Sequence, residues 1–444
     1  MHVTAHLDVD VIAVETEDEV SVLVELTAQT AAPVGDPPQR PTRTLQVVLD
    51  RSGSMSGRIE EAVRALVALV DRLEPADNFG VVSFDNVSEL TVPAGPLTNK
   101  PAVKEALATL HGRNSTNLSD GYLRGLQEAT RVAGPAGATL LLVSDGHANE
   151  GVTDPDALGT VSADAYRKGI VSSTLGWGEG YDERLLSAIA RAGNGNEGFA
   201  ADADAAVALL AGEVEGLLTQ TAQAASLTVR PAPPVTAVRV VNDLPTTATA
   251  DGAIIAELGS FYSGETRKVV VTFAVPSVAS LGLARIATLE LTYVELPALT
   301  QHTVNVPLHV NVVPGDQAAG RVPDPVVRTE MVYQRVQQAK RTASRHLSAG
   351  EPDEALAALD EAQRLVRSQL EAPGVPPQLV ADLRQEAAEL RSLNESTVQG
   401  QWSASAKSMS SSSTYKSRQR GRAAYGSANV TPPEPDDDDN DDTA

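Results

Sequence analysis

Acidic and hydroxyl side chains stand at alternate positions directly after a short apolar segment. The sequence LQVVLD (45–50) ends in Asp50, and Ser52 and Ser54 follow at a spacing of two residues. A tight turn through Gly53, whose backbone is unusually free, can aim these three oxygens at one point. Oxygen-only ligation suits Mg²⁺, Mn²⁺ or Ca²⁺ and does not suit Zn²⁺ or Cu²⁺. The pattern indicates a divalent-cation site, although by itself it also fits a turn that only caps a helix.

Two later segments carry oxygen ligands of the same kind. Thr116 lies in the polar sequence GRNSTNLSDG (112–121), just before a helical pattern, and Asp145 ends the apolar sequence ATLLLVSD (138–145). In an open α/β sheet, ligands bind beyond the carboxyl ends of the strands. Three oxygen-bearing segments in this order are far more specific than one. The candidate ligand set is Asp50, Ser52, Ser54, Thr116 and Asp145.

The elements that must position these ligands lie between residues 44 and 222. Short apolar runs alternate there with amphipathic helical patterns, and the runs are LQVVLD, FGVVSFD, ATLLLVSD and IVSSTLGWG. Each run is too short for a buried helix and is rich in Val, Ile or Leu, as a strand covered on both faces is. This rhythm predicts an α/β fold with a doubly wound, mainly parallel sheet.

Residues 44–222 resemble a von Willebrand factor A (VWA, integrin I-like) domain with an intact metal-ion-dependent adhesion site (MIDAS), of the bacterial cytoplasmic type. The resemblance is carried by DRSGSM (50–55), STNLSDG (115–121) and LLVSDGHANEG (141–151). It implies that Ser52, Ser54 and Thr116 bind a divalent cation, usually Mg²⁺, directly, and that the two aspartates bind it directly or through water. It also implies an open coordination position that accepts an Asp or Glu carboxylate of a partner protein.

The segments on both sides of this domain predict strands. His2 to Val14 and Val20 to Ala28 read as two strands, and residues 226–315 alternate between apolar and polar side chains over several more. Two strands alone cannot bury a face. We therefore expect residues 1–40 and 226–315 to form one β-sandwich in which the α/β domain is inserted. The alternative is that the N-terminal pair caps another edge.

The C-terminal part divides into a helical segment and a low-complexity segment. Residues 325–398 carry three apolar stripes at helical spacing, which predict an antiparallel three-helix unit. Residues 401–444 are rich in serine with scattered Lys and Arg and end in an acidic run, so we expect a disordered tail. The run Ser408–Thr414 is either a modification or recruitment motif or a plain linker.

Composition excludes several classes of function. The chain has 58 acidic and 35 basic residues, a net charge of −23, so we expect no nucleic-acid backbone as partner. It has no cysteine, hence no disulfide and no thiolate site. The N-terminal sequence has no signal-peptide pattern, and no apolar run is long enough for a membrane span. We expect a cytoplasmic protein without membrane insertion, and the oligomeric state stays open.

These observations favour a metal-dependent protein-binding scaffold over an enzyme. Residues 44–222 hold 24 acidic and 13 basic side chains, so we expect a partner that is basic overall and offers one local carboxylate. Two alternatives stay open: an adaptor for a separate ATPase or for a Ser/Thr kinase and phosphatase pair, and a metal-dependent hydrolase using Asp50 and Asp145. His147 and the glycines of GWGEG (176–180) are expected to be ordinary loop residues.

Overall fold

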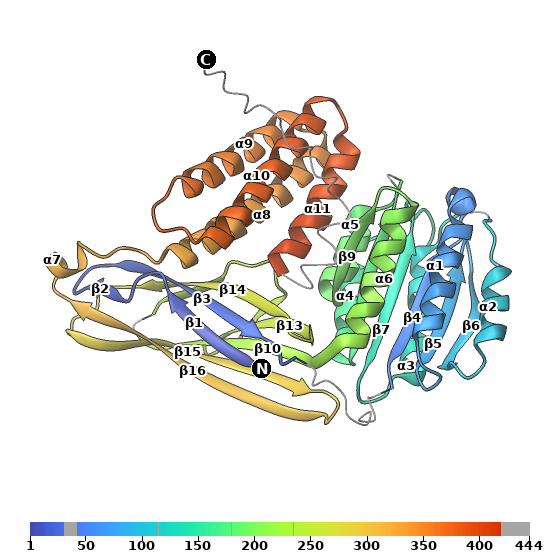
Figure 1. Cartoon of the computed structure of the whole chain (residues 1–444), viewed down its shortest axis with the longest axis horizontal. Helices are drawn as coiled ribbons and strands as arrows, with labels where there is room; N and C mark the ends of the chain where they lie inside the picture. The colour runs from blue at the N-terminus through green and yellow to red at the C-terminus, as the bar shows by residue number, and fades with distance from the viewer. Residues whose placement is uncertain (31–41, 114, 179, 234, 419–444) are drawn as a thin grey trace, which may run out of the picture.

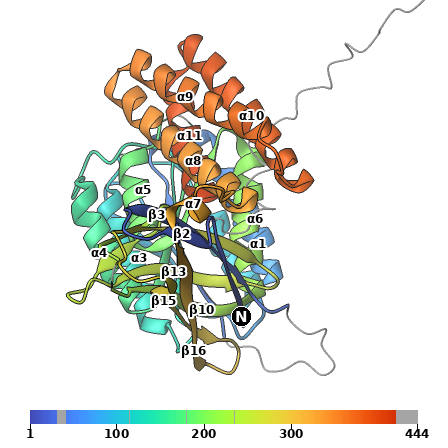
Figure 2. The ribbon, with the colours of Figure 1, turned by 90° about the vertical axis from the view of Figure 1, so that its left-hand side faces the viewer.

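The computed structural model describes residues 1–30, 42–113, 115–178, 180–233 and 235–418. It consists of an α/β domain, a β-sandwich beside it and a group of helices that packs on both (Figure 1). Turned by 90°, the same structure shows the helices above the sandwich and the α/β domain behind (Figure 2). Among these described residues no helix combines the length and the apolar character that crossing a membrane requires.

The α/β domain has a six-stranded sheet in the order β6-β5-β4-β7-β8-β9, in which β6 alone is antiparallel to its neighbour. Its strands are β4 (Thr44–Asp50), β5 (Asn78–Phe84), β6 (Ser88–Pro96), β7 (Ala138–Ser144), β8 (Ile170–Trp177) and β9 (Asn194–Ala200). Between them lie η1 (Gly53–Gly57), α1 (Ile59–Arg72), α2 (Lys100–Ala108), α3 (Leu118–Val132), α4 (Pro155–Arg167), α5 (Glu183–Ala192) and α6 (Ala203–Thr219).

Helices cover both faces of this sheet. Val47 and Leu49 of β4 point into the apolar cluster formed with α1, α2 and α6, whereas Val48 points into the cluster formed with α3, α4 and α5. A strand whose two faces are both covered is mostly apolar, and all seven residues of β4 are buried, the polar Thr44, Gln46 and Asp50 among them. The doubly wound α/β fold that the sequence predicts is confirmed.

The N-terminal strands and the later strands form a single sandwich. One sheet has the order β1-β3-β14-β11 and the other β12-β13-β10-β15-β16-β2. The strands are β1 (His2–Leu7), β2 (Val11–Ala13), β3 (Asp18–Thr27), β10 (Gln220–Pro231), β11 (Ala237–Val240), β12 (Thr246–Ala248), β13 (Ile254–Tyr262), β14 (Thr266–Val275), β15 (Gly282–Glu295) and β16 (Thr300–Val313). β3 pairs with β14 from Asp18↔Val275 to Thr27↔Thr266, so the α/β domain is inserted between two parts of one sandwich.

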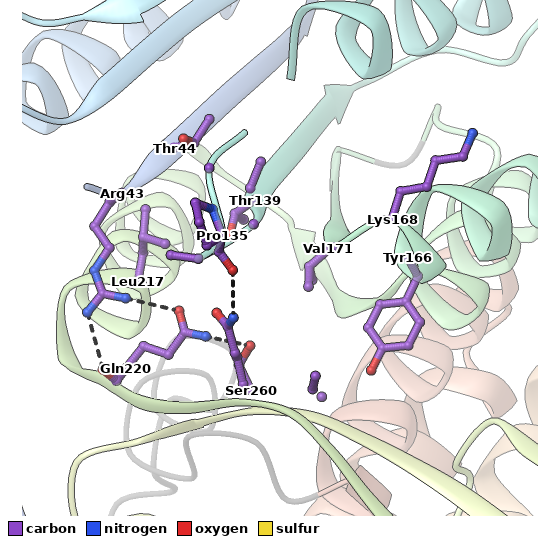
Figure 3. A pocket seen from close by; sticks show the side chains of 18 of the residues that line it. Arg43, Thr44, Pro135, Thr139, Tyr166, Lys168, Val171, Leu217, Gln220 and Ser260 are labelled. Atoms are coloured by element: carbon purple, nitrogen blue, oxygen red, sulfur yellow. Dashed lines mark hydrogen bonds between the residues drawn. The ribbon is translucent and has the colours of Figure 1, made fainter. Parts of the chain in front are cut away.

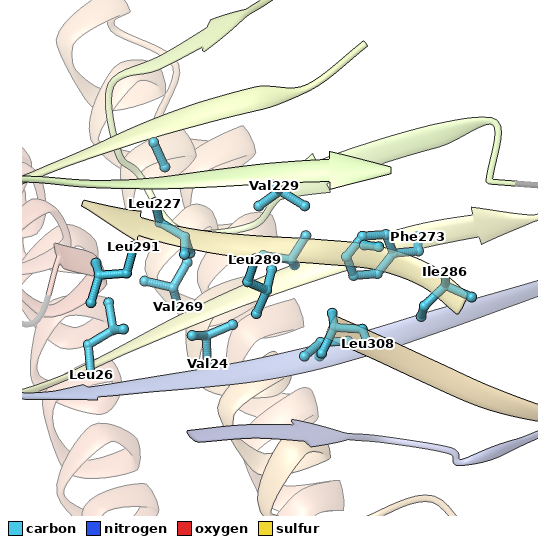
Figure 4. Packing of buried hydrophobic residues seen from close by; sticks show 14 of the residues in the cluster. Val24, Leu26, Leu227, Val229, Val269, Phe273, Ile286, Leu289, Leu291 and Leu308 are labelled. Atoms are coloured by element: carbon cyan, nitrogen blue, oxygen red, sulfur yellow. The ribbon is translucent and has the colours of Figure 1, made fainter. Parts of the chain in front are cut away.

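The inner faces of the two sheets interdigitate in one core. Val24 and Leu26 of β3 meet Leu227, Val269 and Leu289 from the later strands (Figure 4). Because side chains alternate along a strand, Val20, Val22, Val24 and Leu26 of β3 all point into this core. Burial of these apolar side chains holds together segments that lie about two hundred residues apart in the chain.

Two details of the sandwich differ from the sequence prediction. The expected single strand His2–Val14 is two strands, because the Asp8 carboxylate accepts the backbone N–H groups of Val9 and Ser21 and turns the chain from one sheet to the other. The sandwich also resumes at Gln220, where β10 follows α6 directly, and not at residue 226.

Helices follow the sandwich: α7 (Gly315–Ala318), α8 (Pro325–Ala349), α9 (Pro352–Leu370), α10 (Pro377–Val398) and α11 (Trp402–Arg418). The side chain of Asp324 caps α8 by accepting N–H bonds from Val326 and Val327, and Gly350 ends the helix with φ +80°. Apolar side chains of α8, α9, α10 and α11 share one core. The unit therefore has a further long helix beyond the three that the sequence predicts.

The expectation of a disordered tail is wrong for residues 402–418. These residues form α11, which lies between α8, α10 and the α5 and β9 elements of the α/β domain (Figure 1). Its serines are buried by specific hydrogen bonds: Ser411 Oγ donates to Glu197 O at 3.1 Å and Ser417 Oγ donates to Gln334 Oε1 at 2.8 Å. Tertiary partners thus order a polar helix that composition alone assigns to solvent. The remainder of the predicted tail, residues 419–444, lies outside the described residues.

A buried ionic cluster joins α11 to α8 and α10. Lys340, Lys416, Glu386 and Glu389 pair with one another, and Lys340 Nζ lies 2.8 Å from Glu389 Oε1. Burial alone would raise the pKa of Glu389, but the ammonium groups of Lys340 and Lys416 outweigh it and lower this pKa to about 2. The same carboxylates hold the pKa of Lys416 above its usual range against burial.

We expect Lys416→Met to destabilise the protein by roughly 3–5 kcal/mol at pH 7, because it leaves buried carboxylates with one counter-ion fewer. The pKa of Glu389 is lowered from 4.5 to about 2, so its stabilisation is present above pH 4.5 and is lost as the pH falls toward 2. The difference in the free energy of unfolding between wild type and Lys416→Met should therefore shrink on acidification. Urea unfolding from pH 7 to pH 3 measures it. The exposed Lys168→Met should stay within about 0.5 kcal/mol of wild type, and equal losses in both variants would contradict the assignment.

Candidate metal centre

Two neighbouring parallel strands bring the acidic residues of the candidate centre together. Asp50 is the last residue of β4, and Asp145 directly follows β7. The two strands pair in parallel up to Leu49↔Val143, so their carboxyl ends lie side by side. The loops after these strands and the loop before α3 carry the other three predicted residues, Ser52, Ser54 and Thr116. Asp50, Ser52, Thr116 and Asp145 are buried at this edge of the sheet, whereas Ser54 is exposed.

The Asp50 carboxylate is buried and held by two neighbours. Its Oδ1 accepts the backbone N–H of Ser52 at 2.8 Å, and its Oδ2 accepts the hydroxyl of Ser144 at 2.6 Å. Burial raises the pKa of Asp50 to about 6, and the hydrogen bonds from Ser144 and Ser52 oppose that rise. A fixed, poorly solvated carboxylate of this kind is well suited to a cation, which would compensate its charge.

The hydroxyl groups converge beside Asp145. Ser54 Oγ donates to Asp145 Oδ1 at 2.6 Å, and Ser52 Oγ and Ser54 Oγ lie 3.0 Å apart. A Cβ atom placed on Gly146 would lie 3.2 Å from Thr116 Oγ1, 3.4 Å from Ser54 Oγ and 3.7 Å from Ser52 Oγ. Three hydroxyl oxygens therefore face one small space, which the missing side chain of Gly146 leaves free.

The loop of Thr116 is fixed from both sides. Asn117 caps α3 by accepting the N–H of Asp120 at 3.2 Å, so Thr116 stands immediately before the helix. The side-chain oxygen of Asn149 accepts the N–H of Thr116 at 3.1 Å, and the Asn149 N–H donates back to Thr116 O. The loop after β7 thereby ties Thr116 to the Asp145 segment.

Three contributors to the centre are absent from the ligand set predicted from the sequence. Ser144 and Asn149 orient Asp50 and Thr116, and Arg58 pairs with Asp145, its Nη1 lying 2.5 Å from Oδ2. Ser144 and Asn149 lie inside the motif LLVSDGHANEG, which is the sequence signal that could have found them, whereas Arg58 lies outside the three motifs. The other arginine of the first loop, Arg51, turns away and bonds Glu89 at 2.7 Å.

The donors suit a hard divalent cation. They are two carboxylates and three hydroxyls, all oxygen, as Mg²⁺, Mn²⁺ or Ca²⁺ prefers. Across the described ranges, no three His, Cys, Asp or Glu side chains gather into a metal cluster. The donor set thus has few fixed negative charges, since most of its ligands are neutral.

Three residues near the centre could suggest other chemistry by their type and position. His147 is exposed on the loop after β7. Gly176 lies against the Tyr181 ring, where a Cβ atom would come within 2.4 Å of ring carbons. Gly178 has φ +73°, a conformation that favours glycine. Close packing at Gly176 and the backbone conformation at Gly178 therefore account for these two glycines.

A cavity of about 490 Å³ lies at the opposite end of the sheet from these ligands (Figure 3). It is bordered by Thr44 at the start of β4 and by Gln220 and Ser260 of the sandwich. Arg43 Nη1 donates to Gln220 Oε1 at 3.3 Å, and Gln220 Nε2 donates to Ser260 Oγ at 2.8 Å. The cavity marks the junction of the two domains and shares no residue with the candidate metal centre.

In metal chelator, we expect Asp50→Asn to be more stable than wild type at pH 8 by on the order of 3 kcal/mol. The pKa of Asp50 is raised from 3.8 to about 6. The contribution of the protonated carboxyl to the free energy of unfolding is therefore fully present below pH 3.8 and is lost as the pH rises through 6. An amide avoids that loss, and the difference should vanish near pH 4. Urea unfolding in EDTA measures it, with the exposed Asp10→Asn as the control. A less stable Asp50→Asn at pH 8 would contradict this account.

Known proteins match both the domain and the whole fold. The sequence model of the von Willebrand factor type A domain matches residues 45–210. The chain is 32% identical over 174 residues to the uncharacterized protein sll0103 of Synechocystis sp., covering 39% of this chain and 41% of that protein. It is 28% identical over 182 residues to inter-alpha-trypsin inhibitor heavy chain H3 of Rattus norvegicus, and this match covers 38% of this chain and 20% of that protein. The chain thus spans less than half the length of these relatives.

Two solved structures resemble the chain over most of its length. The von Willebrand factor type A protein from Catenulispora acidiphila has a TM-score of 0.68 at 16% identity and covers 89% of this chain and 96% of its own. The ArnB paralog VWA2 from Sulfolobus acidocaldarius has a TM-score of 0.60 at 17% identity, and the match covers 92% of this chain and 98% of that protein. At such identities the likeness concerns the fold. Together with the family match, it establishes that residues 45–210 of this chain form a von Willebrand factor type A domain.

Proposed function

We propose that this chain is a metal-dependent protein-binding module that accepts an acidic side chain of a partner protein at a MIDAS. Ser52, Ser54 and Thr116 would hold the cation directly, and Asp50 and Asp145 directly or through water. VWA domains bind a divalent metal at this site, and for this chain we propose Mg²⁺, with Mn²⁺ or Ca²⁺ as possible substitutes. The single observation that carries the proposal is the convergence of three hydroxyls beside two buried carboxylates.

The charge balance of the centre supports a carboxylate as the incoming ligand. The proposed ligand set has two carboxylates, and its other three donors are neutral hydroxyls. A bound divalent cation would retain enough charge to attract one more anionic oxygen, and it would supply a Lewis-acid position for that ligand. The residues 44–222 carry 24 acidic and 13 basic side chains, so we propose a partner that is basic overall around one exposed Asp or Glu.

The protein's own groups prepare the centre before any ligand arrives. Ser144 and the Ser52 N–H fix the direction of Asp50, while Asn149 fixes Thr116. Because these donors are already held in place, binding of a cation costs less conformational entropy. The rigid β4 and β7 strands carry the two acidic residues, and short loops carry the hydroxyls.

The surroundings of the hydroxyls support binding over catalysis. Ser54 Oγ donates to Asp145, and the hydrogen bonds recorded for Ser52 and Ser54 in the described residues involve no histidine that could act as a base. VWA domains are generally non-catalytic binding modules. The adaptor hypothesis loses its local support, because the serines of residues 408–414 lie in α11 and not in an exposed linker.

We expect Ser54→Ala to weaken Mn²⁺ or Mg²⁺ binding by about tenfold or more, because it removes one ligand and the hydrogen bond that orients Asp145. Ser56→Ala is the matched control, since Ser56 lies in the same loop, is exposed and donates its hydroxyl to Gly53 O at 2.8 Å. Isothermal titration calorimetry on the full chain measures affinity. Affinity purification with Mg²⁺ or with EDTA measures capture of partners. Equal recovery from wild type and Ser54→Ala, with and without EDTA, would overturn the proposed function.

A further inference from the structure

An arginine occupies one side of the candidate metal centre. Arg58 stands at the N-terminal end of α1, and its Nη1 lies 2.5 Å from Asp145 Oδ2. The Asp145 side chain is 0% exposed, whereas that of Arg58 is 36% exposed. The guanidinium therefore reaches in from the rim and neutralises a buried carboxylate, which without a partner would be strongly unfavourable.

The fold leaves room for this guanidinium at a glycine. Gly178 follows β8 with φ +73°, and a Cβ atom built there would lie 2.6 Å from Arg58 Nη2 and 3.0 Å from Arg58 Cζ. Any side chain at this position would displace the arginine. The guanidinium thus lies between Asp145 and the loop after β8, in a space that exists because Gly178 has no side chain.

We propose that Arg58 is an internal counter-cation of the metal centre, which pairs with Asp145 and competes with the divalent cation for that carboxylate. The inference rests on the proposed function, because it needs a metal at the hydroxyls beside Asp145. Arg58 then sets the concentration of divalent cation at which the centre fills.

The hydrogen bonds of the two aspartates indicate that Arg58 competes with the divalent cation and does not assist its binding. Ser54 Oγ already orients Asp145 at 2.6 Å, and the Ser144 hydroxyl and the Ser52 N–H orient Asp50. Arg58 is therefore not needed to aim either carboxylate. A divalent cation and a guanidinium that share one carboxylate repel each other, and in a poorly solvated site that repulsion is substantial. Because the Arg58 side chain is 36% exposed, it can turn toward solvent when the metal binds.

Titration of the full-length chain with Mn²⁺ tests the proposal. We expect Arg58→Gln to bind Mn²⁺ about tenfold more tightly than wild type, because the amide keeps a hydrogen-bond donor but removes the competing charge. Arg58→Lys retains the charge and should stay within about threefold of wild type. Arg113→Gln is the charge control, since Arg113 pairs with Glu89 at 3.7 Å and not with a candidate ligand. It should also stay within about threefold, because an exposed charge is screened.

Thermal unfolding gives an independent reading. In EDTA, Arg58→Gln should unfold at a lower temperature than wild type, because Asp145 loses its partner. Saturating Mn²⁺ should then raise its unfolding temperature more than it raises that of wild type. Circular dichroism shows whether each variant is folded before titration, and Arg58→Lys provides the second variant.

The possible outcomes separate this inference from the proposed function. Equal Mn²⁺ affinity in wild type and Arg58→Gln would overturn the competition and leave the metal site standing. Weaker Mn²⁺ binding by folded Arg58→Gln would also overturn the competition and keep the metal site, since it would mean that Arg58 orients Asp145 for the metal. If neither protein bound Mn²⁺, the competition and the proposed function would both fall.

Discussion

The parallel pairing of β4 with β7 is the interaction on which the rest of the centre depends. It places the ends of two buried strands next to each other, and with them the carboxylates of Asp50 and Asp145. Burying two carboxylates is unfavourable unless hydrogen bonds and counter-charges compensate them. Ser144 and the Ser52 N–H compensate Asp50, and Ser54 and Arg58 compensate Asp145. The geometry of the centre follows from this need for compensation.

The same domain is joined to the sandwich without a linker at its C-terminal end. α6 ends at Thr219 and β10 begins at Gln220, so the last helix of the α/β domain continues into the sandwich. α6 packs on α1, whose N-terminal end carries Arg58. At the other end of the sheet, Arg43 bonds both the side chain and the backbone of Gln220. A displacement of α1 or α6 would therefore reach the sandwich through packed elements.

α11 connects the helical unit to both other domains through polar groups. Lys407 Nζ donates to Tyr181 O at 2.9 Å, in the loop after β8, and Arg418 Nε donates to Asp243 O at 3.0 Å, in the sandwich domain. Burial raises the pKa of Glu197 in this interface to about 7, against hydrogen bonding that includes Ser410. Such an interface specifies one docking geometry, because each buried polar group must meet its own partner.

Local sequence was sufficient to determine the candidate ligands and the fold class of the α/β part. The apolar strand LQVVLD needs cover on both faces, and its terminal Asp50 with Ser52 and Ser54 predicts an oxygen site at the strand end, because these properties depend on neighbouring residues. Only the tertiary structure decided that Arg58 pairs with Asp145 and that residues 402–418 form a helix. An ion pair between residues 87 positions apart has no local signature, and a serine-rich helix forms only where other elements satisfy its hydroxyl groups.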